Sequence, residues 1–268
     1  TEMQSILDKR TKEMGLGQAR AIVVTRDGQV WHGISGDMKT FDKPSLIGSL
    51  TKTFTTTLTM QLVDEGLLSL DDPVGDMGIG FKHDQITIRQ LLTHTSGLSK
   101  YKPTSGPVPK GTTPLDVLRY LSNQPLRNPP GSFVEYSTSG FSVLGHVLEQ
   151  KTDETFEELL RNRITDALGY NVSTFRGDYG SIGFSTGGII MKMDDLADWT
   201  RRYFFDRTTT KEKWNWSMRT TTGVGTHGYC PCRNKSFLAL GHIGGRTFAS
   251  VDGDGTVVVI DTTGILVL

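Results

Sequence analysis

Strand-forming patterns at both ends of the chain constrain the fold more than any other feature of the sequence. Residues 19–36 alternate apolar and polar side chains around Asp27-Gly28, a dipeptide that favours a tight hairpin turn. Residues 247–251 and 256–262 are rich in β-formers and flank a second run of aspartate and glycine. Because helical patterns separate these regions, we expect one antiparallel sheet built from both chain ends.

The middle of the chain predicts helices, because its apolar side chains recur at helical spacing. An amphipathic helix around Ile6 and Met14 is expected before the hairpin, and a buried helix is expected from Thr51 to Glu65. Asp194 is the expected N-cap of the last helix. The further helices are expected at residues 87–94, 114–123, 139–151, 155–168 and 194–205.

These elements predict an α+β fold in a single domain with two subdomains. Residues 1–65 and 190–268 are expected to form the sheet and its flanking helices, and residues 66–189 are expected to form an all-helical insertion. A cleft is expected where the two subdomains meet. The stretch 100–111 is rich in glycine and proline, which predicts a loop at the rim of that cleft.

Charge and hydropathy exclude several classes of partner. The 29 basic residues balance the 29 acidic ones, so the net charge indicates neither a nucleic-acid partner nor a general attraction to anionic membranes. No apolar run approaches the roughly 18–20 residues of a membrane-spanning helix. The first residues carry no export signal, but the sequence also lacks an initiating methionine, so we expect that such a signal could have been removed.

The two cysteines, Cys230 and Cys232, are too few to hold a disulfide-based fold together. A bridge across a single intervening residue would close a short, strained ring, and a metal site would need more ligands than the nearby His227 supplies. Three interpretations stay open: two unlinked thiols, a local redox-sensitive bridge, or a metal site.

The strongest chemical signal is a serine followed three residues later by a lysine, at the start of the predicted helix 51–65. Three residues make almost one helical turn, so Ser49 and Lys52 face the same way. A lysine that burial shifts towards its neutral form can accept the serine proton. Taken alone the pair is weak evidence, because a serine at a helix start is usually an N-cap.

Four further motifs follow this pair in a fixed order. They are Leu-Leu-Thr-His-Thr-Ser-Gly-Leu at 91–98, Tyr136-Ser137-Thr138, Gly187-Gly188-Ile189, and Gly241-His242-Ile243-Gly244-Gly245. Over about residues 19–262, this order resembles the β-lactamase-related serine hydrolases, which include class C β-lactamases, DD-carboxypeptidases, D-aminopeptidases and several esterases. The resemblance implies the β-lactamase/transpeptidase-like form of the α+β fold.

The resemblance also implies a role for each matching residue. Ser49 would attack a carbonyl, Lys52 and Tyr136 would move its proton, and His242 would take the Lys or His position of the last motif. The N–H groups of Ser49 and Gly245 would bind the oxyanion. Gly244 and Thr138 would border the substrate. No cofactor or metal is implied, and the enzyme would be prokaryotic and extracytoplasmic, although a cytoplasmic location stays open.

Two departures from the family pattern bear on the substrate. Thr138 stands where the family has asparagine, and it replaces an amide by one hydroxyl. The chain also stops at Leu268, whereas family members continue through a further strand and a helix. The predicted function is hydrolysis of D-aminoacyl peptides or related amides and esters through an acyl-enzyme. A promiscuous carboxylesterase, a β-lactamase and a non-catalytic cell-wall peptide-binding protein are the alternatives.

Single residues of these motifs also allow structural interpretations. Tyr136 could be an ordinary core residue, and His242 could be a hydrogen-bonded strand residue. For His94 the structural interpretation is preferred, because its motif reads as the C-terminal end of a helix closed by Gly97.

Overall fold

The computed structural model describes residues 1–77, 80–99, 101, 113–174, 184–203, 237–241, 247–251 and 254–262. Apart from Tyr101, the loop predicted at 100–111 lies outside these residues, as do Cys230 and Cys232. Among the helices of the described parts, none has the length and apolar character needed to cross a bilayer.

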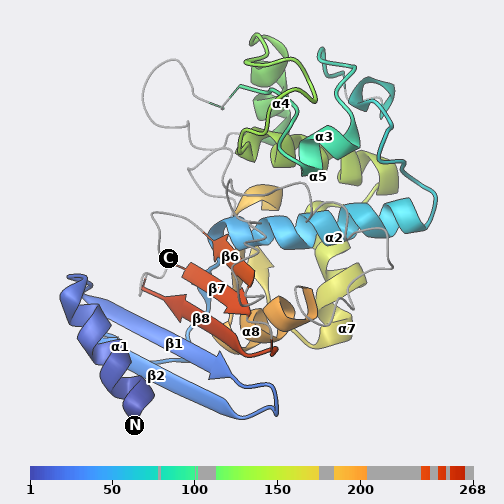
Figure 1. Ribbon diagram of the computed structural model, residues 1–268. Helices are drawn as coiled ribbons and strands as arrows, with labels where there is room; N and C mark the ends of the chain where they lie inside the picture. The colour runs from blue at the N-terminus through green and yellow to red at the C-terminus, as the bar shows by residue number, and fades with distance from the viewer. Residues whose placement is uncertain are drawn as a thin grey trace.

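The main sheet has five antiparallel strands drawn from both ends of the chain (Figure 1). Its order is β2 (Val30–Gly36), β1 (Gln18–Val24), β8 (Val257–Asp261), β7 (Thr247–Val251) and β6 (Phe237–Gly241). The pairing of β1 with β8 joins the N-terminal hairpin to the C-terminal strands. The predicted antiparallel sheet is confirmed, and β6, which ends at Gly241, forms its edge beside β7.

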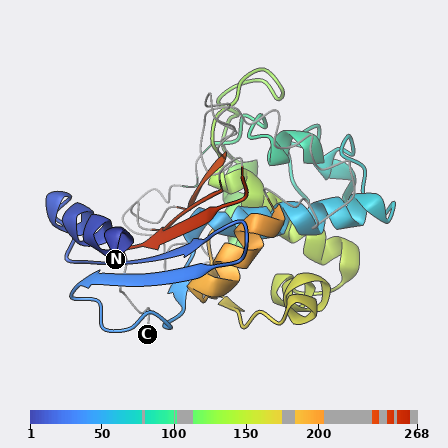
Figure 2. The ribbon, with the colours of Figure 1, turned by 60° about the horizontal axis from the view of Figure 1, so that its bottom comes forward.

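Two helices cover opposite faces of this sheet (Figure 2). α1 (Glu2–Glu13) packs on β1 and β2, with Leu7 in a small apolar cluster. α8 (Met193–Arg201) packs on β1, β7 and β8 as part of the main core. The N-cap of α8 is Lys192, and the prediction of Asp194 was wrong, because the helix already begins at the buried Met193 and Asp194 lies in its first turn.

The remaining helices gather around α2, which runs between the sheet and α3, α4 and α5 (Figure 1). Nearly every side chain of α2 is buried, although threonines make up much of it. Because β-branched residues are mediocre helix formers, packing on all sides must hold this helix in place. The bounds are α2 Thr51–Asp64, α3 Ile88–Leu92, α4 Pro114–Ser122, α5 Thr138–Thr152, α6 Phe156–Leu160 and α7 Asp166–Leu168.

A second, small sheet lies beside α2 and has the order β3 (Ser45–Leu46), β5 (Ile189–Met191) and β4 (Ser173–Thr174). It brings the residues just before Ser49 next to the segment that precedes α8. These short strands were not predicted. The division of the chain into subdomains at residues 66 and 189 stays a prediction.

Candidate active site

Ser49 lies in a tight turn that leads directly into α2. The turn is a 3-10 helix, Gly48–Leu50, and all three of its residues are buried. Gly48 has a left-handed φ of 57°, a conformation that favours glycine. The N–H of Ile47 donates to the carbonyl of Ile189 at 2.9 Å, which ties the start of the turn to β5. The sequence Ile-Gly-Ser therefore presents the serine at the N-terminal end of a buried helix.

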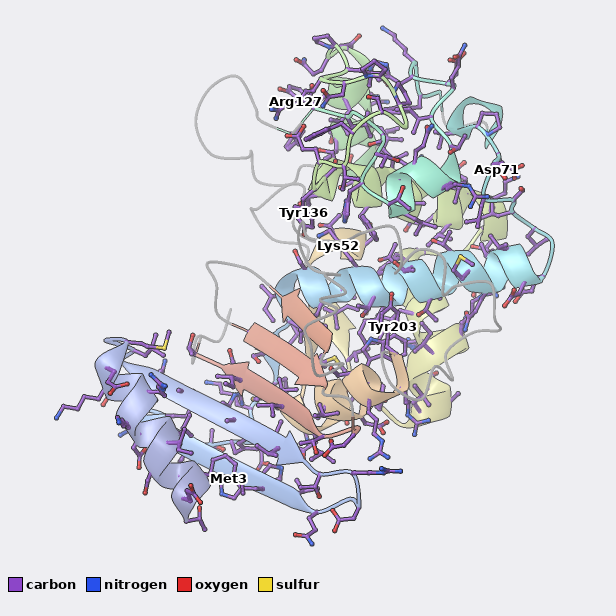
Figure 3. All side chains as sticks on the ribbon, in the orientation of Figure 1. Met3, Lys52, Asp71, Arg127, Tyr136 and Tyr203 are labelled. Atoms are coloured by element: carbon purple, nitrogen blue, oxygen red, sulfur yellow. The ribbon has the colours of Figure 1, made fainter. Side chains whose placement is uncertain are left out.

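The hydroxyl of Ser49 contacts both residues that the sequence pairs with it. The Nζ of Lys52 donates to Ser49 Oγ at 3.1 Å, one helical turn away. The Oγ also lies 2.7 Å from the phenolic oxygen of Tyr136, which lies two residues before the start of α5. Figure 3 shows Tyr136 and Lys52 next to each other above the N-terminal end of α2. The structure thus brings Ser49, Lys52 and Tyr136 together.

Burial changes the acid–base properties of Lys52. Its side chain is fully buried, and the loss of water around the ammonium lowers its pKa from 10.5, while the charge and hydrogen bond of Tyr136 partly oppose this shift. The Nζ also donates to the carbonyl of Thr186 at 2.6 Å. It lies 5.2 Å from the centre of the Tyr136 ring. The lowered pKa favours the neutral amine of Lys52, and this amine lies within hydrogen-bonding distance of Ser49 Oγ, so it can take the serine proton.

The carbonyl of Thr186 is a site group that sequence reasoning missed. It belongs to the short 3-10 helix Phe184–Thr186, which packs against α2 and α5. The hydroxyl of Ser185 in the same turn donates to the carbonyl of Phe141 at 2.7 Å, and this fixes the turn on α5. The only signal in the sequence is the Gly187-Gly188 pair that follows, which marks a change of chain direction without identifying a ligand for lysine.

Thr138 is the first residue of α5 and is partly exposed. Within the described part of the chain, its hydroxyl makes no hydrogen bond, and Lys52 bonds to Thr186 instead. The N-cap of this helix is Ser137, whose hydroxyl accepts from the N–H of Gly140 at 3.1 Å. Thr138 therefore lies two residues after Tyr136, with a hydroxyl that could meet a substrate.

The remaining predicted site residues, His242, Gly244 and Gly245, lie outside the described residues. They belong to the connection between β6 and β7, whose last described pair is Gly241 with Thr247. The strand that leads into this connection, β6, contacts the turn that carries Ser49. In the ranges that the structure describes, no cluster of three or more His, Cys, Asp or Glu side chains could hold a metal ion.

His94 also lies at this site, although sequence reasoning assigned it to a helix end. α3 is shorter than predicted: it ends at Leu92, with Thr93 as its C-cap. His94 follows and is almost completely buried. The centre of its ring lies 4.7 Å from the ring of Tyr136.

Comparisons with known proteins identify the family of the chain. The family model described as Beta-lactamase matches residues 16–264. Penicillin-binding protein 4 of Amycolatopsis lactamdurans is 32% identical over 185 residues, which cover 61% of this chain and 46% of that protein. The D-alanyl-D-alanine-carboxypeptidase/endopeptidase AmpH of Escherichia coli is 27% identical over 200 residues, covering 62% of this chain and 51% of that protein. The chain thus spans about half the length of these relatives.

Among solved structures, a D-stereospecific amidohydrolase from Streptomyces is similar over nearly the whole chain. The superposition has a TM-score of 0.78 at 22% identity and covers 96% of this chain and 93% of that one. This likeness confirms the predicted α+β fold of the β-lactamase/transpeptidase type.

Proposed function

Because the chain belongs to the β-lactamase family, we propose that it is a serine hydrolase that forms an acyl-enzyme on Ser49. The observation that carries this proposal is the double hydrogen bond of Ser49 Oγ, to the Nζ of a fully buried Lys52 and to the hydroxyl of Tyr136. A serine at a helix start that only caps the helix needs neither partner. Burying an amine costs free energy, and this cost is expected where the amine has a chemical task.

The proposed reaction has two halves. As Ser49 Oγ attacks the substrate carbonyl, neutral Lys52 takes the serine proton, directly or through Tyr136. The proton then passes to the leaving amine or alcohol, which departs and leaves an ester on Ser49. In the second half, the same groups take a proton from water, which attacks that ester, and return the proton to Ser49 Oγ as the acid departs. We assign the oxyanion contacts to the N–H groups of Ser49 and Gly245.

For the substrate, we propose D-aminoacyl peptides or related amides. The names of the carboxypeptidase relative and of the structurally similar D-stereospecific amidohydrolase support this class. In this proposal His242 is a catalytic residue in the Lys or His position of the last motif, and Gly244 and Thr138 border the substrate. No cofactor takes part, and the protein works outside the cytoplasm. β-Lactams are expected to acylate Ser49 and to leave slowly, because the sequence contains no carboxylate clearly dedicated to activating the deacylating water.

A carboxylesterase is the second candidate, and Thr138 favours it. An asparagine could donate to a substrate amide and accept from lysine at once, whereas threonine has a single hydroxyl. Here Lys52 bonds to the Thr186 carbonyl, so Thr138 does not complete that bridge in the described structure. An ester carbonyl is more reactive than an amide carbonyl and needs less assistance of this kind.

The test is covalent labelling followed by turnover. The protein is incubated with a fluorophosphonate and, separately, with a penicillin, and its intact mass and modified peptide are determined. We expect one adduct on Ser49, and none in Ser49→Ala, which should stay folded. Ser69→Ala changes an exposed serine in the segment that follows α2 and is the matched control that should label normally.

Turnover of matched D-aminoacyl amides and p-nitrophenyl esters then separates the candidates. A peptidase or amidase should cleave both, and an esterase only the second. Rapid turnover of nitrocefin without an accumulating adduct would indicate a β-lactamase. Labelling of Ser49→Ala at the wild-type rate would contradict the nucleophile assignment, and an inert wild type would leave the cell-wall peptide-binding protein as the better interpretation.

A further inference from the structure

The backbone of His94 adopts a conformation that few residues other than glycine accept. Its φ is 58°, and among the described residues Asp153 is the only other non-glycine residue with a positive φ. Asp153 is the C-cap of α5, where a left-handed residue ends a helix in the usual way. His94 directly follows Thr93, the C-cap of α3, and the N–H groups of His94 and Thr95 donate to the carbonyls of Leu91 and Gln90 at 3.3 and 2.9 Å, so its left-handed φ closes α3. The role of His94 at the site rests on the further contacts that it makes there.

This conformation lets His94 hold the residues on both sides of Tyr136. The carbonyl of His94 accepts from the N–H of Glu135 at 2.8 Å. Its side-chain Nδ1 accepts from the N–H of Ser137 at 3.1 Å. One residue thus binds the backbone immediately before and immediately after the tyrosine that contacts Ser49. With these two peptides fixed, the Tyr136 side chain has little freedom to move away from the serine.

The ring of His94 adds a lateral contact. Its centre lies 4.7 Å from the ring of Tyr136 and 5.3 Å from the ring of Phe141 on α5. His94 is 1% exposed, so its ring is enclosed by protein, whereas Tyr136 is partly exposed. A phenol confined between an imidazole and the Ser49 hydroxyl is restricted to a narrow range of positions.

The residues that follow His94 anchor it to the chain leading to Tyr136. The carbonyl of Thr95 accepts from the N–H of Gly131 at 2.8 Å, and the carbonyl of Gly97 accepts from the N–H of Arg127 at 2.8 Å. A side chain at Gly97 would clash with the carbonyl of Asn128, because a Cβ there would lie 2.0 Å from it. His94 therefore stands on a rigid backbone platform.

The hydrogen bond to Ser137 also fixes the protonation of the ring. A backbone N–H can only donate, so the Nδ1 that faces it must carry a lone pair. The ring is therefore neutral with its proton on Nε2. Protonation at Nδ1 would place two donors against each other and release one side of Tyr136.

We propose that His94 is a positioning residue that aligns the Tyr136 phenol with Ser49 for proton transfer. The inference rests on the proposed function, since it gives Tyr136 a part in acylation. His94 itself does not touch the substrate in this proposal. Its contribution comes from alignment, and an error of about 1 Å in a reacting group can slow a reaction by about 100-fold.

Two nearly isosteric substitutions test the proposal. In His94→Asn, Oδ1 takes the bonded position of Nδ1 and can accept from Ser137, and asparagine tolerates a left-handed φ. His94→Leu has the same branching without an acceptor. We expect His94→Leu to slow fluorophosphonate labelling of Ser49 by about tenfold or more, and His94→Asn to stay within about threefold of the wild type. If His94→Leu does not fold, His94→Gly removes the acceptor without strain at φ.

The same substitutions are then made in Tyr136→Phe. A positioning role predicts that the His94 change has almost no further effect there, because the hydroxyl it aligns is gone. A merely structural role predicts the same additional loss in both backgrounds. Equal labelling rates for His94→Asn and His94→Leu, or full additivity with Tyr136→Phe, would overturn the inference while leaving the proposed function intact. A wild type that does not label would overturn both.

Discussion

At the scale of single residues, burial and hydrogen bonding decide what Lys52 can do. An exposed lysine is charged at neutral pH and cannot accept a proton, but Lys52 is fully buried and burial lowers its pKa from 10.5. Two of the partners of its Nζ, Ser49 Oγ and the Thr186 carbonyl, are neutral, and the contact with Tyr136 only partly opposes the lowering of the pKa. No carboxylate among its described partners offsets the cost of burying the charge.

The lowered pKa predicts a particular dependence of stability on pH. Between the folded pKa and 10.5, the unfolded chain holds a proton on Lys52 that the folded protein has released. The free energy of unfolding of the wild type should therefore rise with pH across this window, relative to that of Lys52→Met. Below the window the difference is constant, because both states of the wild type are protonated. Urea unfolding of both proteins at a series of pH values measures it.

Acylation should follow the same titration, with a labelling rate that rises with pH through a midpoint below 10.5. In the unfolding experiment, Lys151→Met is the control for losing one positive charge, because it removes an exposed lysine at the end of α5. If the difference in unfolding free energy between the wild type and Lys52→Met falls with rising pH, the pKa of Lys52 is not lowered.

The site residues differ in how far the sequence could predict them. The spacing of Ser49 and Lys52 fixes their common face once a helix starts there, and Tyr136 was found through its motif. The Thr186 carbonyl was not predictable, because every residue carries such a group and only tertiary structure selects one. The positioning by His94 was missed as well, because it depends on hydrogen bonds to the N–H groups of Glu135 and Ser137, and only tertiary structure brings these distant residues together.

At the scale of elements, α2 is held by its threonine hydroxyls as well as by apolar packing. Thr53 is the clearest case: its hydroxyl donates to the carbonyl of Leu50 at 2.6 Å and accepts from the indole N–H of Trp199 at 2.8 Å. The ring of Trp199 also stacks on Phe54 with centres 4.0 Å apart. These contacts fix α8 to the first turn of α2. They lie beside Leu50, the residue that follows Ser49.

Thr53→Val should therefore be clearly destabilising. It leaves the buried indole N–H of Trp199 without its acceptor, which costs about 1–3 kcal/mol of unfolding free energy. Thr59→Val is the matched control, since the Thr59 hydroxyl only donates to the carbonyl of Thr55 within the same helix, at 2.8 Å. Its stability should change by less than about 0.5 kcal/mol, because valine keeps the shape and orphans no buried donor. Equal losses in urea unfolding would refute this explanation of the helix.

The elements also show where periodicity stops being informative. The long helices and the two outer hairpin regions were predicted, because each contains several repeats of its pattern. β3, β4 and β5 contain only two or three residues each, which is too short for any period. The helix expected over 155–168 is interrupted by a π-helical turn, Arg161–Thr165, which shares the apolar spacing of its neighbours.

At the scale of the whole molecule, one buried ion pair joins three distant parts of the chain. Arg20 on β1 and Asp261 on β8 are register partners, and the guanidinium lies 2.9 Å from the carboxylate. Their side chains are 3% and 0% exposed. Arg20 also donates to the carbonyl of Phe41 at 2.6 Å, in the segment that leads to β3 and Ser49. The N-terminal hairpin, the C-terminal strands and the approach to the nucleophile are thus connected.

Asp261→Asn should destabilise the entire fold, because it leaves a buried guanidinium without a counter-charge. Breaking one side of a buried pair costs about 3–5 kcal/mol, which is a large part of the stability of a typical domain. The control is Asp71→Asn, which disrupts a pair with Arg89 that has contacts of 2.7 and 2.8 Å but an Asp71 side chain 72% exposed. Solvent screens that pair, so its loss should be much smaller. Urea unfolding of the two variants and the wild type at pH 7 measures both losses of stability.

Because the three segments are joined through Arg20, Asp261→Asn should also slow labelling of Ser49 in the fraction that remains folded, whereas Asp71→Asn should not. Similar unfolding midpoints for the two variants would show that the buried pair does not hold these segments together.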